Sequence, residues 1–294
     1  MELFGIPSKA LFGQLLLGLI NGSFYAVLSL GLAVIFGLLN IINFSHGALY
    51  MVGAFVALLG LNHLGMSYWT ALLVAPALVG ALGMLIERTM LKHLYKLDHL
   101  YGLLLTFGLA LIGEGLFRYY FGVSGESYPV PEQLQGGVDL GFIFLPLYRG
   151  WVVLASLAVC TATWYLIERT SLGATLRAAT QRPDLVQALG INVPLMVTLT
   201  YGAGVALAAF AGVLAAPVIQ VNPVMGSNLI IVVFAVVVIG GMGSIAGSII
   251  TGLGLGVIEG LTKVIYPEAS AVVIFVIMIV VLLFRPAGLF GKQA

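Results

Sequence analysis

Long apolar stretches follow one another along almost the whole chain, and they limit what it can fold into. They cover residues 11–39, 44–61, 70–87, 101–121, 151–167, 195–217 and 270–284. A helix that crosses the hydrocarbon core of a bilayer needs about 20 residues, so most of these stretches are long enough. Only 8% of the residues are charged, against about 25% in soluble domains. The sequence therefore predicts an all-α, polytopic membrane protein.

One further apolar region, residues 228–261, is too long for a single simple helix. It is interrupted by the run Gly240-Gly241-Met242-Gly243-Ser244, and clustered glycines favour a helix end. We therefore expect two spans or two half-helices that meet at this break. The prediction is about 8–9 transmembrane or half-spanning helices in a single transmembrane domain over residues 1–294.

The distribution of charge predicts an orientation. Lysine and arginine gather at residues 88–96, at residues 169–194 and at the C-terminus, and such clusters mark the cytoplasmic side. The loop at about 122–147 carries Glu126, Glu132 and Asp139, so we expect it to face outside. The first stretch is long enough to be tilted, or broken near Asn21-Gly22, which leaves the side of the N-terminus open.

Polar residues interrupt the apolar pattern most densely between Asn40 and Phe55, where Asn43, Ser45 and His46 stand close together. An unpartnered polar group inside a membrane costs several kcal/mol. These side chains must therefore contact protein, water or a ligand. No metal-ligand spacing links His46 to other histidines, carboxylates or Cys160. Because this run starts at the predicted cytoplasmic side, a structural polar cluster near an inner gate is favoured over a substrate pocket.

Other polar residues are weaker candidates for the translocation pathway or gate. Asn21 and Tyr25 lie on one face of the first stretch, where they can hydrogen-bond between helices or line a pathway. Gly241 and Ser244 belong to the break. Glu114 with Arg118, and Glu259 with Lys263, have the four-residue spacing of neutralising ion pairs. No isolated acid is found in the middle of a stretch, which argues against proton coupling.

The polar segment 171–192 reads as two short helices. Pro183 ends the first and opens the second, and Gly190 fits a C-terminal cap. Leucines and alanines form a modest apolar face beside Arg177 and Arg182. Such a segment is either a docking surface for a cytoplasmic partner or an interfacial loop whose arginines only follow the positive-inside rule.

Several motifs along the chain resemble parts of one protein family. The run Leu176-Arg177-Ala178, followed by Leu189-Gly190-Ile191-Asn192, resembles the cytoplasmic coupling loop of branched-chain amino acid ABC transporter permeases. The stretches 21–28, 43–53, 240–247 and 285–291 resemble other parts of that family. The resemblance runs in order along almost the whole chain. It is greater to the first, H-type permease than to the second, which usually has a longer N-terminal extension.

The resemblance implies a subunit of a bacterial inner-membrane importer and no enzymatic activity or cofactor of its own. It implies a second permease subunit, two cytoplasmic ATPases and an external solute-binding protein as partners. The residues implied to couple to the ATPases are Leu176, Arg177, Arg182, Asp184, Leu185, Leu189 and Gly190. The chain has no G-x-x-x-x-G-K-[ST] motif with which to bind ATP itself.

The expected activity is transport of branched-chain or other hydrophobic amino acids by alternating access, without catalytic residues. Two alternatives stay open. Related permeases carry urea or short amides, which also suit a largely apolar cavity with few polar groups. A stand-alone channel or secondary transporter would belong to a different class.

Overall fold

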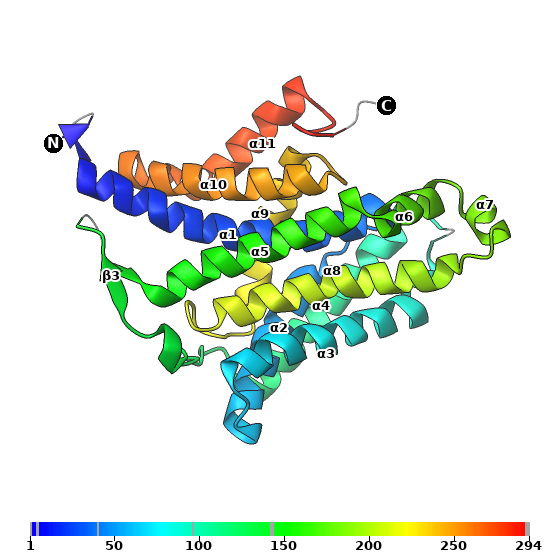
Figure 1. Ribbon diagram of the computed structural model, residues 1–294, viewed down its shortest axis with the longest axis horizontal. Coiled ribbons are helices and arrows are strands. Elements are labelled where there is room, and N and C mark those ends of the chain that lie inside the picture. Colours follow the sequence, from blue (N-terminus) through cyan, green and yellow to red (C-terminus); the bar gives the residue numbers. More distant parts are fainter. Residues whose placement is uncertain (1, 4–5, 40, 96, 142–143, 292–294) are drawn as a thin grey trace. The chain divides into compact units, whose positions relative to one another are not determined.

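The computed structural model describes residues 2–3, 6–39, 41–95, 97–141 and 144–291, and these fold mainly into helices (Figure 1). Asn40 lies outside the described residues. The α-helices are α1 (Ser8–Leu39), α2 (Ser45–Leu64), α3 (Tyr68–Thr89), α4 (His99–Phe121), α5 (Leu147–Arg169), α6 (Ser171–Gln181), α7 (Pro183–Ala188), α8 (Val193–Ala215), α9 (Met225–Gly240), α10 (Ile245–Ile265) and α11 (Val273–Phe284). Single 3₁₀ turns are η1 (Leu91–His93), η2 (Glu132–Leu134) and η3 (Pro267–Ala269).

The remaining regular structure consists of two small antiparallel hairpins. Strand β1 (Glu2–Leu3) pairs with β2 (Ile6–Pro7), and β3 (Gly137–Asp139) pairs with β4 (Phe144–Pro146). The second hairpin lies in the loop between α4 and α5. Neither contributes to a larger sheet, and the prediction of an all-α membrane fold is confirmed.

The helices agree well with the predicted spans. Among the described residues, seven helices are long and apolar enough to cross a membrane, and α9 and α11 are shorter apolar helices. The break between α9 and α10 is present: Gly241 has φ +101° and Gly243 has φ +89°. Helix α1 continues through Asn21 and Gly22, so the alternative of a break there is wrong.

The described chain divides into two compact units. The first contains residues 1–29, 129–160 and 232–294, and the second contains residues 30–128 and 161–231. The prediction of one transmembrane domain stays a prediction. Each unit is held together by its own set of close helix contacts.

In the second unit, α8 is the most enclosed long helix, and its small residues face its neighbours. A Cβ atom on Gly53 of α2 would lie 2.5 Å from the Cα of Ala209 in α8. A Cβ on Gly212 would lie 2.1 Å from the carbonyl oxygen of Tyr50. Helix α3 approaches in the same way, with Gly83 against Val205. Small residues at these points let α2 and α3 touch the backbone or short side chains of α8.

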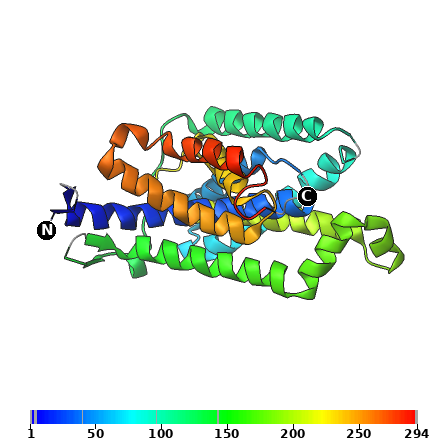
Figure 2. The same ribbon diagram turned by 90° about the horizontal axis from the view of Figure 1, so that it is seen from above.

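In the first unit, α1 and α10 lie side by side and run in opposite directions (Figures 1 and 2). A Cβ on Gly256 would lie 2.3 Å from the Cα of Gly22, and one on Gly252 would lie 2.7 Å from the Cα of Ala26. Gly252 and Gly256, four residues apart on α10, therefore both face α1 at close range. Cys160, also in this unit, is buried.

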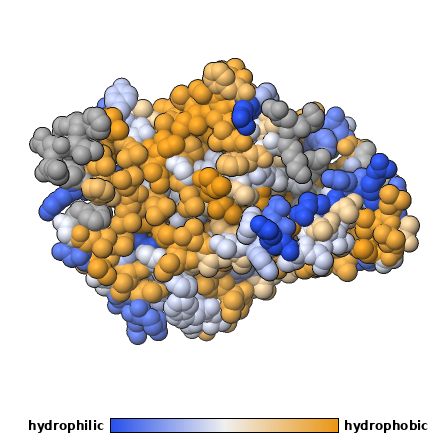
Figure 3. All heavy atoms as spheres, turned by 45° about the horizontal axis from the view of Figure 1, so that its top comes forward, coloured by the Kyte–Doolittle hydropathy of each residue, from blue (hydrophilic) through white to orange (hydrophobic). Residues whose placement is uncertain are grey.

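The outer surface is that of a membrane protein. Hydrophobic residues cover most of the face seen in Figure 3, and hydrophilic residues gather in a few patches. On α4 alone, large apolar side chains such as Leu104, Leu111 and Ile112 are more than half exposed. Lipid can cover such side chains at no cost, because the hydrocarbon core is as apolar as leucine.

The contact between α1 and α10 predicts opposite effects for two glycines of one helix. Gly256→Ala should lower the free energy of unfolding by about 1–3 kcal/mol, because the new methyl group meets the backbone of α1. Gly254→Ala should leave it unchanged or raise it slightly, because a Cβ there meets open space and alanine favours the helix. Unfolding of the purified protein in mixed micelles, followed by circular dichroism, measures both. Equal effects would contradict the close contact.

Candidate functional site

The segment predicted to couple to partner proteins folds as two short helices, α6 and α7, at the end of α5 (Figures 1 and 2). The turn between α5 and α6 is tight. A Cβ on Gly173 would lie 1.8 Å from the carbonyl oxygen of Ile167, so a larger residue cannot fit there. Arg177 Nη1 donates to that same oxygen at 2.7 Å and lies 3.7 Å from Glu168 Oε2. These contacts fix the direction in which α6 leaves the longer helix.

Helix α7 begins and ends where the sequence indicates. Pro183 occupies its first turn. At its other end the N–H of Gly190 donates to Gln187 O at 2.9 Å, and the N–H of Ile191 donates to Val186 O at 3.3 Å. This pair of bonds is a Schellman motif, and Gly190 has the left-handed φ of +84° that it requires. The six-residue helix is thereby held in one conformation.

The apolar residues of this segment divide between two faces. Ala179 and Val186 are buried and pack with Val193 at the start of α8. Leu185 and Leu189 are exposed, at 60% and 80%. The leucines and alanines therefore do not all lie on one face: Ala179 is buried together with Val186, whose burial the sequence did not indicate, whereas Leu185 and Leu189 are exposed. Arg182 and Asp184 are exposed, and Leu176 and Arg177 are partly buried.

The polar run before α2 forms a compact buried cluster in the second unit. Ser45 Oγ donates to Asn43 Oδ1 at 2.5 Å, and both residues are at most 2% exposed. Thr106 of α4 completes the cluster: its Oγ1 accepts from the N–H of Phe44 and donates to Ile42 O, both at 3.1 Å. We call Asn43, Ser45 and Thr106 the α2 polar cluster. It ties the start of α2 to α4.

His46 lies one residue further on and is fully buried. Its ring packs beneath α1, because a Cβ on Gly31 would lie 2.9 Å from His46 Cε1. That Cβ would also lie 2.6 Å from Gly204 O. Among the described residues, no group of three histidines, cysteines or acids could hold a metal ion. His46 therefore fills the space at a crossing of α1, α2 and α8.

The other predicted pathway residues belong to the first unit, where Tyr25, Gly241 and Ser244 contact neighbouring segments. Tyr25 OH donates to Glu259 Oε2 at 2.8 Å, while Lys263 Nζ bonds Glu259 Oε1 at 2.6 Å. Ser244 is the N-cap of α10 and accepts from Gly247 N at 3.1 Å. Gly241 lies against the C-terminal segment, with its Cβ position 2.4 Å from Gly291 N. Asn21, on α1, is partly buried.

A buried acid was missed at the end of α3. Glu87 is 2% exposed, whereas its place beside Arg88 suggests an interface anchor. Tyr95 OH donates to its Oε1 at 2.5 Å, and Thr198 Oγ1 donates to its Oε2 at 2.6 Å. Burial and then the Glu87 carboxylate raise the pKa of Tyr95 above its ordinary value, so this hydroxyl keeps its proton. The acid joins α3, α8 and the loop after α3.

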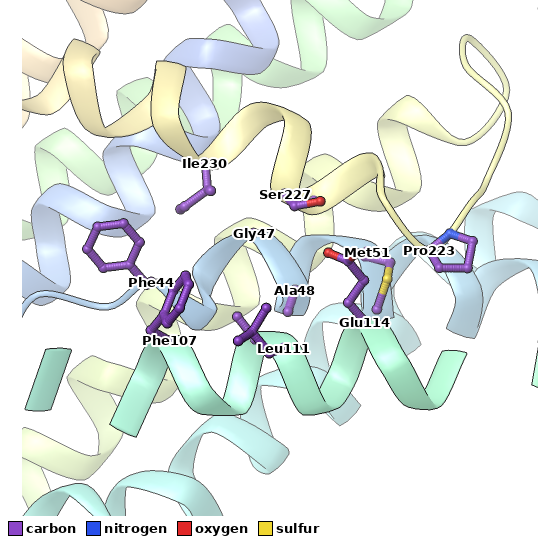
Figure 4. A pocket seen from close by; sticks show the side chains of 12 residues that line it. Phe44, Gly47, Ala48, Met51, Phe107, Leu111, Glu114, Pro223, Ser227 and Ile230 are labelled. Carbon is purple, nitrogen blue, oxygen red and sulfur yellow. The ribbon is translucent and has the colours of Figure 1, made fainter. Parts of the chain in front are cut away.

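A pocket in the second unit lies between α2, α4 and the first turns of α9 (Figure 4). Its volume is about 60 Å³. Apolar side chains form most of its wall, and the polar side chains are Glu114 and Ser227. Glu114 Oε1 is 2.8 Å from Arg118 Nη2, which makes the expected ion pair. The sequence showed that pair but not the pocket, whose walls come from three separate segments.

Comparison with known proteins places these features in a family. A family model described as "Branched-chain amino acid transport system / permease component" matches residues 14–282. The chain is 30% identical to the high-affinity branched-chain amino acid transport system permease protein BraD of Pseudomonas aeruginosa, over 95% of both chains. It is 29% identical to LivH of Salmonella typhimurium, also over 95% of both chains.

The second permease type matches less completely. LivM of Escherichia coli is 28% identical, and the match covers 90% of this chain but 67% of LivM. No solved structure matches the chain. The full-length matches to LivH and BraD agree with the predicted H-type resemblance. The chain therefore belongs to the permease family of branched-chain amino acid ABC transporters and is a multi-pass protein of the inner membrane.

Proposed function

We propose that this chain is one of two permease subunits of an importer that moves branched-chain or other hydrophobic amino acids by ATP-driven alternating access. Its relatives BraD and LivH are permeases of branched-chain amino acid transport systems. The observation that carries the proposal is the rigid α6–α7 segment, which presents exposed leucines and charges at the end of α5. One of the two cytoplasmic ATPases would bind there, the other would bind the second permease, and an external protein would deliver the amino acid.

The proposed orientation follows from charge and from the count of helices. The loop with Arg88 and Lys92 and the α6–α7 segment lie in the cytoplasm by the positive-inside rule. Three long helices, α1, α2 and α3, separate the first of these loops from the N-terminus. An odd number of crossings puts the N-terminus outside. The loop with β3 and β4 then faces the external binding protein.

Transport itself provides the first test. In liposomes that contain this chain with its second permease and both ATPases, and with the binding protein outside, leucine uptake should require ATP. Uptake of radiolabelled leucine, isoleucine and valine is compared with that of urea. Uptake of urea but not of the amino acids would show that the substrate is urea or a short amide instead. Uptake by the isolated chain without ATP would favour a channel or secondary transporter and contradict the proposal.

Docking depends on the exposed leucines of the coupling segment. The double variant Leu185→Asp and Leu189→Asp should weaken co-purification of the ATPases at least tenfold, because burial of one leucine contributes about 1.5–3 kcal/mol. The melting temperature of the permease should change little, because both side chains face solvent. Leu140→Asp, at an exposed position in the loop after α4, is the matched control. Undiminished co-purification would exclude this face as the docking surface.

We also propose that Glu87 holds the cytoplasmic end of α3 to α8. Glu87→Leu should lower the free energy of unfolding by about 1–3 kcal/mol, because Tyr95 loses its acceptor inside the protein. Glu87→Gln, which keeps a carbonyl acceptor, should cost less. Thermal unfolding of the purified subunit measures both variants against Glu132→Leu, an exposed acid. If Glu87→Leu were no worse than that control, the polar link would not contribute to stability.

A further inference from the structure

The pocket between α2, α4 and α9 supports a further proposal, which rests on the proposed function. We propose that it receives the branched side chain of the amino acid during translocation, with that side chain against the apolar wall and the ammonium group on Glu114. The lining residues come from the second unit alone. The wall that would receive the side chain is formed by Phe44, Met51, Phe107, Leu111 and Ile230.

The size of the pocket suits a short branched chain. A cavity needs about 10–15 Å³ to admit a single water, and this one has about 60 Å³. It is therefore large enough for a group of a few heavy atoms. An isobutyl group has four carbon atoms. A long or aromatic side chain would require the walls to separate.

Glu114 is the charged group of the pocket, and its position favours a cation. Its side chain is only 20% exposed, while that of Arg118 is 47% exposed. Figure 4 shows the carboxylate rising from α4 toward α2 and the first turn of α9, where Ser227 lies. Arg118 is bound through Oε1. Among the described side chains, no hydrogen bond to Oε2 is found, so this oxygen can accept from an ammonium group.

Backbone packing fixes the position of α9 at the pocket. A Cβ on Gly226 would lie 2.1 Å from Gly47 O, and one on Gly47 would lie 2.6 Å from Gly226 O. The start of α9 therefore rests directly on α2, and its next turn places Ile230 over the apolar wall. Broken helices that end within the membrane are a common way to build transporter sites.

Aromatic contacts between α2 and α4 bracket the pocket along the two helices. On one side Phe44 meets Phe107 with ring centroids 6.2 Å apart. On the other side Phe55 meets Phe117 at 4.7 Å and Phe121 at 4.9 Å. Glu114 lies between these contacts in the sequence of α4. The pocket therefore lies between two sets of ring contacts that join α2 and α4.

Two kinds of variant test the site in the complete transporter reconstituted in liposomes with its binding protein. Ala110→Leu fills the pocket but leaves Glu114 and Arg118 in place, and it should reduce ATP-dependent leucine uptake at least tenfold. Gly115→Leu on the same helix points into open space and should leave uptake within twofold of the wild type. Glu114→Gln should reduce uptake at least tenfold, with the assembled complex still obtained in normal yield.

A labelling experiment reads occupancy directly. In Ser227→Cys transporter in nanodiscs, millimolar leucine should slow the reaction with N-ethylmaleimide at least threefold, and glutamate should not, because Glu114 repels its second carboxylate. Asn228→Cys, an exposed neighbour, is the control and should show no protection. Normal leucine uptake by both Ala110→Leu and Glu114→Gln would overturn the site while the proposed function stands. Absence of any amino acid uptake by the wild type would overturn both.

Discussion

Close approach of helix backbones is the constraint on which the rest of this structure depends. Inside a bilayer, apolar side chains gain nothing by leaving lipid, so helices associate where van der Waals contact is densest. Gly212 against the backbone of Tyr50 and Gly256 against that of Gly22 show how this is achieved. A contact made by backbone atoms leaves little freedom for sliding. Side chains beside it, such as Ser45 and His46, are therefore held in defined positions.

Contacts between small residues do not by themselves fix how two helices are aligned along their axes. Buried hydrogen bonds do fix this alignment. Helix faces lined by glycine can pack in several alignments. Thr106, however, can hydrogen-bond to the backbone of residues 42 and 44 in only one of these alignments. Glu87 does the same for Tyr95 and Thr198. An unsatisfied buried group costs about 1–3 kcal/mol, which is enough to penalise a shifted alignment. These clusters contain few residues, yet each joins segments that are distant in the sequence.

Features encoded within one segment were predictable, and those assembled from several were not. The spans followed from apolar length, the α9–α10 break from its glycines, and the bounds of α7 from Pro183 and Gly190. The burial of Glu87 was missed because its partner Thr198 is 111 residues away. The burial of Val186 in α7 was not predicted, because six residues are too few to show a helical period. There the contact of Ile191 with the cluster around Val186 decides which side is buried.

Phe44 connects the α2 polar cluster to the pocket. Its N–H is bonded to Thr106 at 3.1 Å, and its ring lines the pocket and meets Phe107. A motion that separates α2 from α4 at this level must break hydrogen bonds that each contribute about 0.5–1.5 kcal/mol. At the level of Phe55, the contacts between the described residues of α2 and α4 are made by aromatic rings. Under the proposed alternating access, the two ends of the pocket therefore differ in how they open. The hydrogen-bonded end, which the charge pattern puts toward the cytoplasm, is the one where work from the ATPases would be required.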